Sequence, residues 1–247
     1  MRKNWNRHIA NIWLQILNTI KPDKKGLFLE IAPGEVNKIG LALSKYNFEG
    51  KLFIIEPNKN ALKRIRKDYM KNLSCTVRPI NKMLDSIING LPENISCVLS
   101  NHPMDDFIVG KYLKSKDFDN FFDDHYDGDP EKTRSIWKKI GNKPKSLKKK
   151  RDLVFKEWCE LIDKRKSEIV IISQYKSYFF KSNKIPFADK QAFLVVKMLR
   201  KRYKRFEISL DNIEGIHDKS RWLLLDFRRR TNFIVVTESK DLKREGK

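Results

Sequence analysis

The hydrophobic positions of the chain recur first with the period of a helix and then in short runs of strand length. Residues 5–20 place apolar side chains three and four positions apart, and Pro22 ends the helix that this spacing predicts. Apolar runs of strand length follow at residues 26–31, 51–55, 74–77, 95–100 and 168–173. Amphipathic stretches of helical period lie between and after these runs. The sequence therefore predicts an α/β fold with a doubly wound, mostly parallel sheet.

The last part of the chain has a different pattern. Residues 206–210 alternate as a strand, and residues 221–227 and 232–237 predict an antiparallel C-terminal hairpin. No Gly/Ser-rich or Pro-rich linker divides the 247 residues. We expect an N-terminal helix in residues 1–25, one domain in residues 26–238 and a charged tail in residues 239–247. Residues 103–150 form a helical or loop insertion after the fourth strand, and a long insertion of this kind is expected to cover the ligand face as a lid.

Residues 27–58 form the unit around which the other elements are arranged. A strand, the turn Ala32-Pro33-Gly34-Glu35, an amphipathic helix and a second strand ending at Glu56 make a βαβ unit. A turn of small residues lets backbone N–H groups approach a ligand, and a carboxylate at the tip of the second strand can accept both hydroxyls of a ribose. The turn lacks the Gly-x-Gly-x-x-Gly spacing of Rossmann dehydrogenases, which disfavours that class.

This unit resembles the class I S-adenosylmethionine-dependent methyltransferases, whose first motif is acidic-x-Gly-x-Gly-x-Gly and whose second strand ends in an acidic residue. The resemblance implies that Glu30 and the turn through Gly34 hold the amino-acid end of S-adenosylmethionine, and that Glu56 holds its ribose. Ala32 and Val36 replace two of the three glycines. A nucleic-acid-binding or assembly protein that kept the fold and lost turnover is therefore a second interpretation. The residues that the resemblance assigns to the cofactor are Glu30, Ala32, Pro33, Gly34, Glu56, Pro57, Asn81 and Ser100.

The fourth strand ends in Asn101-His102-Pro103-Met104, which is similar to the fourth motif of methyltransferases that act on the amino group of a nucleobase. The resemblance implies that Asn101 orients the amine, while Met104 replaces the usual aromatic residue. His102 or Asp105 is a candidate general base. A polar strand end without a catalytic role is the alternative.

Charge adds a candidate partner. The chain has 53 Lys and Arg against 31 Asp and Glu, a formal charge of +22, which favours nucleic acid and, second, an anionic membrane surface. An A/T-rich genome is an alternative source of so many lysines. Aromatic and basic side chains also alternate after the fifth strand, where they can stack on bases and pair with phosphates. The candidate nucleic-acid-binding residues are Lys143, Lys145, Lys148, Lys149, Lys150, Arg151, Tyr175, Lys176, Tyr178 and Lys181. RNA is favoured over DNA because no duplex-reading motif is visible.

The remaining features set limits. An acidic cluster around Gly128 does not fit a calcium loop, because Arg134 stands where a bidentate glutamate is required, and we expect no metal site. Three scattered cysteines favour a reducing, intracellular compartment, cytoplasmic or within an organelle or nucleus. No run approaches the ~20 apolar residues of a membrane helix, so no membrane partner is expected.

Overall fold

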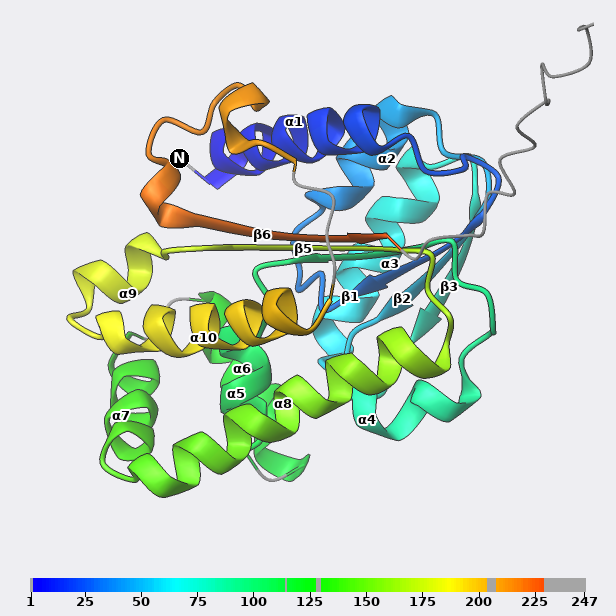
Figure 1. Ribbon diagram of the computed structural model, residues 1–247. Coiled ribbons are helices and arrows are strands. Elements are labelled where there is room, and N and C mark those ends of the chain that lie inside the picture. The colour runs from blue at the N-terminus through cyan, green and yellow to red at the C-terminus, as the bar shows by residue number, and fades with distance from the viewer. Residues whose placement is uncertain (1, 114, 128–129, 204–207, 229–247) are drawn as a thin grey trace, which may run out of the picture.

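The computed structural model describes residues 2–113, 115–127, 130–203 and 208–228. Its centre is a six-stranded sheet with the strand order β3-β2-β1-β4-β5-β6 (Figure 1). The strands are β1 (Leu27–Ile31), β2 (Lys51–Ile55), β3 (Thr76–Ile80), β4 (Cys97–Asn101), β5 (Ile169–Tyr175) and β6 (Trp222–Arg228). The first five strands pair in parallel and β6 pairs antiparallel with β5. This is the class I methyltransferase-like fold that the sequence predicts.

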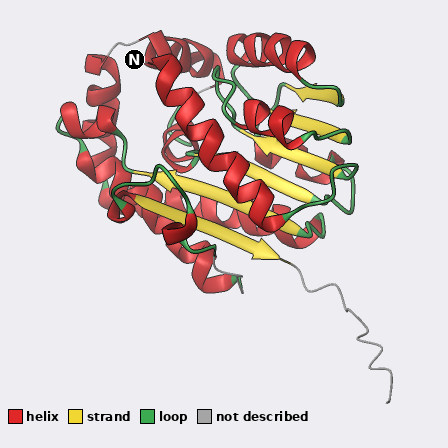
Figure 2. Ribbon diagram, turned by 90° about the horizontal axis from the view of Figure 1, so that it is seen from above, coloured by secondary structure: helices red, strands yellow, loops and turns green. Residues whose placement is uncertain are grey.

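Helices cover both faces of the sheet, as Figures 1 and 2 show. One face carries α1 (Arg2–Ile20), α2 (Ile39–Tyr46) and α3 (Lys59–Asn72). Below the sheet in Figure 1 lie α4 (Leu84–Ile87), α5 (Met104–Gly110), α8 (Pro144–Lys164) and α10 (Pro186–Arg202). Three more helices, α6 (Ser115–Asp127), α7 (Pro130–Gly141) and α9 (Tyr178–Ser182), lie toward the left of that view. The short 3₁₀ helices are η1 (Ile88–Gly90), η2 (Leu210–Asn212) and η3 (Lys219–Arg221).

The two faces have separate hydrophobic cores, because strand side chains alternate between them. Phe28, Leu52 and Ile54 pack with Trp13 of α1 on one face, while Leu29 packs among the helices of the other. The helical stripe of residues 5–20 is confirmed, with all apolar members buried except Trp5, which is 44% exposed. Asn58 caps α3, since its side chain accepts a hydrogen bond from the Ala61 N–H.

Several element boundaries differ from the prediction. The third strand begins two residues later than expected and includes Pro79, which is tolerated because β3 is an edge strand. Ile80 is the last residue of this strand, and the short helix α4 follows it. The fifth strand continues to Tyr175, two residues beyond the predicted end.

The predictions for the C-terminal part are partly wrong. Ser209 accepts a hydrogen bond from the Asp211 N–H and begins η2, so residues 208–210 do not extend a strand; residues 206–207 lie outside the described part. The first half of the predicted hairpin is β6, and residues 232–237 and the tail at 239–247 also lie outside the described part. Pro144 occupies the first position of α8, so the candidate nucleic-acid-binding cations from Lys145 to Arg151 lie in this helix.

Candidate functional site

A cavity of about 620 Å³ lies where the strand order reverses, between β1 and β4. Parallel α/β sheets bind ligands at this switch point, outside the carboxyl ends of the strands. The lining includes Ala32 and Pro33 after β1, Asn101 and His102 at the end of β4, and residues 175–180 around the end of β5. The structure thus brings together predicted residues that lie up to about 145 positions apart in the sequence.

The turn after β1 keeps a glycine-like backbone although only one glycine is present. Ala32 has φ +51° and Gly34 has φ +67°, both in the left-handed region. The Ala32 N–H donates to the Ile55 carbonyl (2.9 Å), and the Gly34 N–H donates to Glu56 Oε2 (2.9 Å). The first turn is therefore bonded to the tip of β2, which brings the two halves of the predicted motif into contact.

Glu56 is buried, with 4% of its surface exposed, and its second oxygen accepts from the Asn58 N–H (2.9 Å). Burial raises the pKa of Glu56 to about 7, although these two backbone bonds oppose the shift. Asn81 donates to the carbonyls of Glu56 and Pro57, at 3.0 and 2.8 Å, and so fixes the turn after β2. Glu56 and Pro57 line a second, small cavity of about 30 Å³ beside the first.

Two of the residues assigned to the cofactor lie in the core. Glu30 is 1% exposed and accepts a hydrogen bond from the Tyr69 hydroxyl (2.6 Å), which itself accepts from the Gly40 N–H. Burial raises the pKa of Glu30 to about 8 despite this bond. Ser100 is buried as well and donates to the Ile31 carbonyl (2.7 Å), which joins β4 to β1. Neither side chain lines either cavity.

The amide of Asn101 is held by three contacts. Its Oδ1 accepts from the Trp13 indole (2.9 Å) and from the Ser173 hydroxyl (3.0 Å), and its Nδ2 donates to the Tyr175 hydroxyl (3.4 Å). A carbonyl oxygen has two lone pairs, and both are used within the protein. Orienting an acceptor amine through this oxygen would require one of these bonds to break.

His102 and Asp105 form a buried ion pair, with 3.1 Å between Nδ1 and Oδ1. The other ring nitrogen lies 2.7 Å from the Tyr175 carbonyl, so both nitrogens donate when the ring is protonated. Burial lowers the pKa of His102, but the Asp105 charge and hydrogen bond outweigh it and raise the pKa to about 10. Asp105 also accepts from Gln174 (3.3 Å). A histidine that holds its proton at neutral pH does not serve as a general base.

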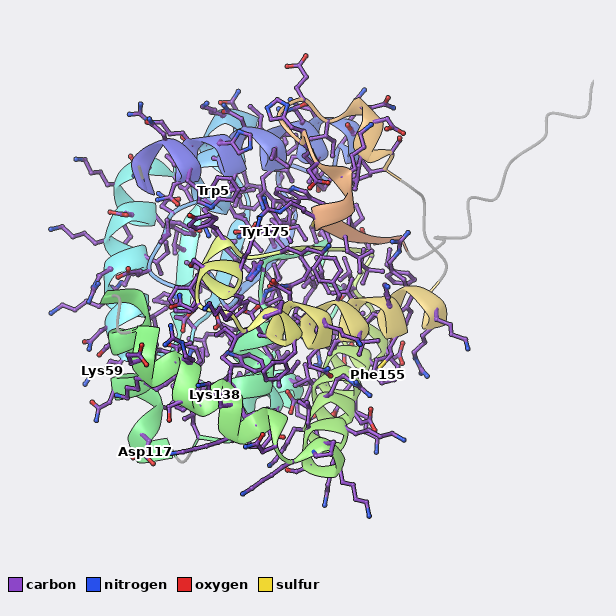
Figure 3. The ribbon with its side chains drawn as sticks, turned by 90° about the vertical axis from the view of Figure 1, so that its left-hand side faces the viewer. Trp5, Lys59, Asp117, Lys138, Phe155 and Tyr175 are labelled. Atoms are coloured by element: carbon purple, nitrogen blue, oxygen red, sulfur yellow. The ribbon has the colours of Figure 1, made fainter. Side chains whose placement is uncertain are left out.

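Tyr175 is the centre of an aromatic cluster on the cavity wall. Its ring centroid lies 4.3 Å from that of His102, 4.7 Å from Trp222 and 5.8 Å from Trp5. Figure 3 shows Trp5 and Tyr175 next to each other on this side of the molecule. Lys38 donates to the Tyr175 hydroxyl (3.4 Å), and its charge, followed by that of His102, lowers the Tyr175 pKa although burial opposes this. A wall of aromatic rings beside cations suits a flat, anionic ligand.

Sequence patterns missed several residues of this wall. Trp5 and His8 come from α1, and the apolar spacing that predicted this helix does not indicate that it borders a cavity. His217 and Arg221 come from the segment before β6, and Trp222 is the first residue of β6. The one available signal was Trp5, an aromatic residue at the amino end of an otherwise buried stripe.

The candidate nucleic-acid-binding residues fall into two groups. Tyr175, Lys176 and Tyr178 line the cavity, and Tyr178 is 76% exposed at its edge. The others lie outside the lining: Lys181 on α9, Lys143 just before α8, and Lys145, Lys148, Lys149, Lys150 and Arg151 on α8. Of these, Lys150 contacts the Tyr112 ring (5.9 Å) and Arg151 bonds Gln191 (3.0 Å), whereas Lys143, Lys145, Lys148 and Lys149 are exposed.

The helix α6, within the predicted lid, closes the small cavity. Phe118 and Phe122 line it opposite Glu56, and Asp123 accepts from the side chains of Asn58 (3.0 Å) and Asn60 (2.6 Å). Figure 3 shows Lys59 of α3 and Asp117 of α6 on the same side. A volume of about 30 Å³ is the share of one water molecule in the liquid, far below the ~300 Å³ of a small-ligand pocket. The carboxylate, the turn and the Asn81 amide suit a nucleoside, but an adenosyl group enters only after α6 has moved.

The described residues contain neither a group of metal-ligating side chains nor a membrane-spanning helix. No group of three or more His, Cys, Asp or Glu side chains there is placed to hold a metal ion. Within the same ranges, no helix combines the length and the apolar character needed to cross a membrane.

The sequence matches no protein-family model and no curated protein. Solved structures with a similar fold include three methyltransferases. The plantazolicin methyltransferase BpumL in complex with SAH is 10% identical, with a TM-score of 0.48 over 91% of this chain and 84% of that chain. The methyltransferase domain of bacterial CtHen1 is 10% identical, with a TM-score of 0.45 over 91% of this chain and 99% of that chain. The bifunctional kinase-methyltransferase WbdD is 10% identical, with a TM-score of 0.40 over 72% of this chain, which spans only 31% of that chain. At these identities the likeness concerns the fold alone.

Proposed function

We propose that this protein is an S-adenosylmethionine-dependent methyltransferase that acts on nucleic acid, with RNA favoured over DNA. The observation that carries the proposal is the meeting of two unlike cavities at the switch point of the sheet. One contains the carboxylate of Glu56, and the other has an aromatic and cationic wall.

The residues of the small cavity suit the nucleoside part of the cofactor. Glu56 retains unused lone pairs beside its two backbone bonds, and Asn81 and Pro57 hold the turn that presents it. The positive φ of Ala32 and Gly34 directs the turn after β1 toward the larger cavity, where the amino-acid end would lie. S-adenosylmethionine supplies a methyl group on a positively charged sulfur, and the protein contributes by holding donor and acceptor in line.

The residues of the larger cavity suit a nucleotide. Trp5, Tyr175 and Trp222 offer ring faces to a base, while Lys38, Lys176 and Arg221 offer positive charge to phosphate. The exposed lysines at the start of α8 and the formal charge of +22 extend this attraction beyond the cavity.

Two observations favour a second function. The closed position of α6 and the single glycine of the first turn also suit a protein that binds RNA and no longer binds the cofactor. In that case the aromatic and cationic cavity would bind RNA, and the small cavity would stay closed.

Titration of the purified protein with S-adenosylmethionine separates the two functions. We expect saturable binding, which Glu56→Ala abolishes while RNA binding persists, and which the exposed control Glu49→Ala leaves unchanged. Transfer of labelled methyl groups to RNA and to DNA then identifies the acceptor. Absence of heat and of a thermal shift at millimolar cofactor would refute the enzyme and favour the RNA-binding protein. Equal loss of cofactor and RNA binding in Glu56→Ala would indicate misfolding, which a melting curve would reveal.

A further inference from the structure

Asp106 lies at the junction of the two cavities. It lies in the first turn of α5 and is half-buried. Among the described residues, only Asp106 and Ala32 line both cavities. Its neighbour Asp105 turns away, to His102 and Gln174. A ligand beside Glu56 and a ligand in the larger cavity would therefore both lie near Ala32 and Asp106.

The carboxyl of Asp106 differs from the other acidic groups of the site in having no hydrogen bond or ion pair within the described residues. Burial raises its pKa well above the ordinary value, and the charges of Asp105 and Glu56 raise it further. His102 and Lys38, the cations that face it, lower it but do not compensate. Burial and these acidic charges therefore favour the protonated form of the Asp106 carboxyl more than in an ordinary aspartate.

We propose that Asp106 is a catalytic residue of the methyl transfer, whose carboxylate takes up the proton that the acceptor loses. The inference rests on the proposed function. In the balanced step the methyl–sulfur bond breaks and sulfur keeps the electron pair, a bond forms from the acceptor oxygen or nitrogen to the methyl carbon, and the O–H or N–H proton moves to an Asp106 oxygen. His102 and Asp105 are occupied with each other, which leaves Asp106 as the carboxylate that faces both ligands.

The electrostatics add a way to observe this group without turnover. A positive charge beside a carboxyl favours its ionised form, so a cationic ligand at the junction releases the proton of Asp106. S-adenosylmethionine carries such a charge on sulfur, whereas S-adenosylhomocysteine has the same shape without the methyl group and without the charge. The first ligand should therefore release more protons on binding than the second, and Asp106 becomes a base only when the methyl donor is present.

Calorimetric titration at pH 7 in two buffers of different ionisation enthalpy measures the protons released. We expect S-adenosylmethionine to release up to about one proton more than S-adenosylhomocysteine in the unmodified protein. The excess should vanish in Asp106→Asn and persist in Asp68→Asn, which removes an exposed carboxylate on α3 far from the junction. Single-turnover methylation by Asp106→Asn should fall about 100-fold or more.

The outcomes separate the two proposals. Binding of both ligands by the unmodified protein with equal proton release would overturn the role of Asp106 and leave the methyltransferase in place. Persistence of the excess in Asp106→Asn, with an unchanged melting temperature, would also overturn it. Failure of either ligand to bind the unmodified protein would refute the proposed function, and the role of Asp106 with it. The measurement on the unmodified protein does not depend on whether a variant folds.

Discussion

Weakening the contact of α6 with α3 should tighten cofactor binding. The carboxylate of Asp123 accepts hydrogen bonds from Asn58 and Asn60, at 3.0 and 2.6 Å. Together with bonds from Asn58 and Lys59 to Asp119, at 3.4 and 3.2 Å, they hold α6 over the small cavity. Asp123→Ala removes both bonds. The Asn58 cap of α3 persists, because Asn58 uses its Oδ1 for the Ala61 N–H.

The size of the effect follows from the two bonds. Side-chain hydrogen bonds in a half-exposed setting contribute about 0.5–1 kcal/mol each, so the closed position loses about 1–2 kcal/mol relative to the open one. When only the open form binds, the apparent dissociation constant varies inversely with the open fraction. At 1.4 kcal/mol for each factor of ten, affinity for S-adenosylmethionine should rise about 5- to 30-fold.

Isothermal titration of S-adenosylmethionine into the unmodified protein, Asp123→Ala and Asn120→Ala tests this expectation. Asn120 is an exposed residue of the same helix, so its variant controls for the loss of a polar side chain from α6. Unchanged or weaker binding by Asp123→Ala, with Asn120→Ala like the unmodified protein, would refute the reasoning that α6 gates the cavity. An equal gain in both variants would show that the contacts of Asp123 are not the cause.

Three further predictions concern pH and salt. Glu30 keeps its proton up to about pH 8 when the protein is folded, so the stability of the protein should fall as pH rises from about 4.5 toward 8. The melting temperature of Glu30→Gln should therefore be higher than that of the unmodified protein at pH 8.5 and equal to it near pH 4.5. The raised pKa of His102 contributes stability that is complete below about pH 6.5 and is lost as pH rises through about 10. In urea titrations, His102→Asn should therefore lower the unfolding free energy by about 3 kcal/mol at pH 6, and by progressively less toward pH 10. Lys148→Ala with Lys149→Ala should reduce the salt slope of RNA binding by about 1–1.5, as measured by filter retention across salt concentrations, and leave S-adenosylmethionine affinity unchanged.

Each of these predictions has an opposing result. A melting difference for Glu30→Gln that does not vary with pH would contradict its titration, and weaker cofactor binding by this variant would show that Glu30 contacts the cofactor after all. A constant deficit of His102→Asn from pH 6 to pH 10 would contradict the ion pair with Asp105. An unchanged salt slope in the double lysine variant would show that Lys148 and Lys149 of α8 do not contact RNA phosphates.

The positions of most strands along the chain were predictable because burial on both faces leaves long apolar runs in the sequence. The position of Glu56 at the end of β2 was predictable for the same reason, because an acidic residue directly after an apolar run marks the end of a buried strand. The direction of a buried side chain was not predictable: Glu30 stands one position before Ile31 in β1, and the pleat turns it toward Tyr69 in the core rather than toward the cavity. The adjacent pair Asp105 and Asp106 shows the same limit, because helical geometry sends one carboxyl to His102 and the other to the cavity junction.

The helix α1 has a consequence for how the site forms during synthesis. Trp13 donates to Asn101, and Gln15 both accepts from and donates to the backbone of Glu214, at 2.8 and 3.2 Å. These bonds join α1 to residues that lie about 90 and 200 positions further along the chain, so this wall of the cavity forms only after those residues have been synthesised. A version of the chain trimmed to begin at β1 would lose Trp5 and His8 from the lining of the larger cavity, together with the Trp13 indole that holds Asn101.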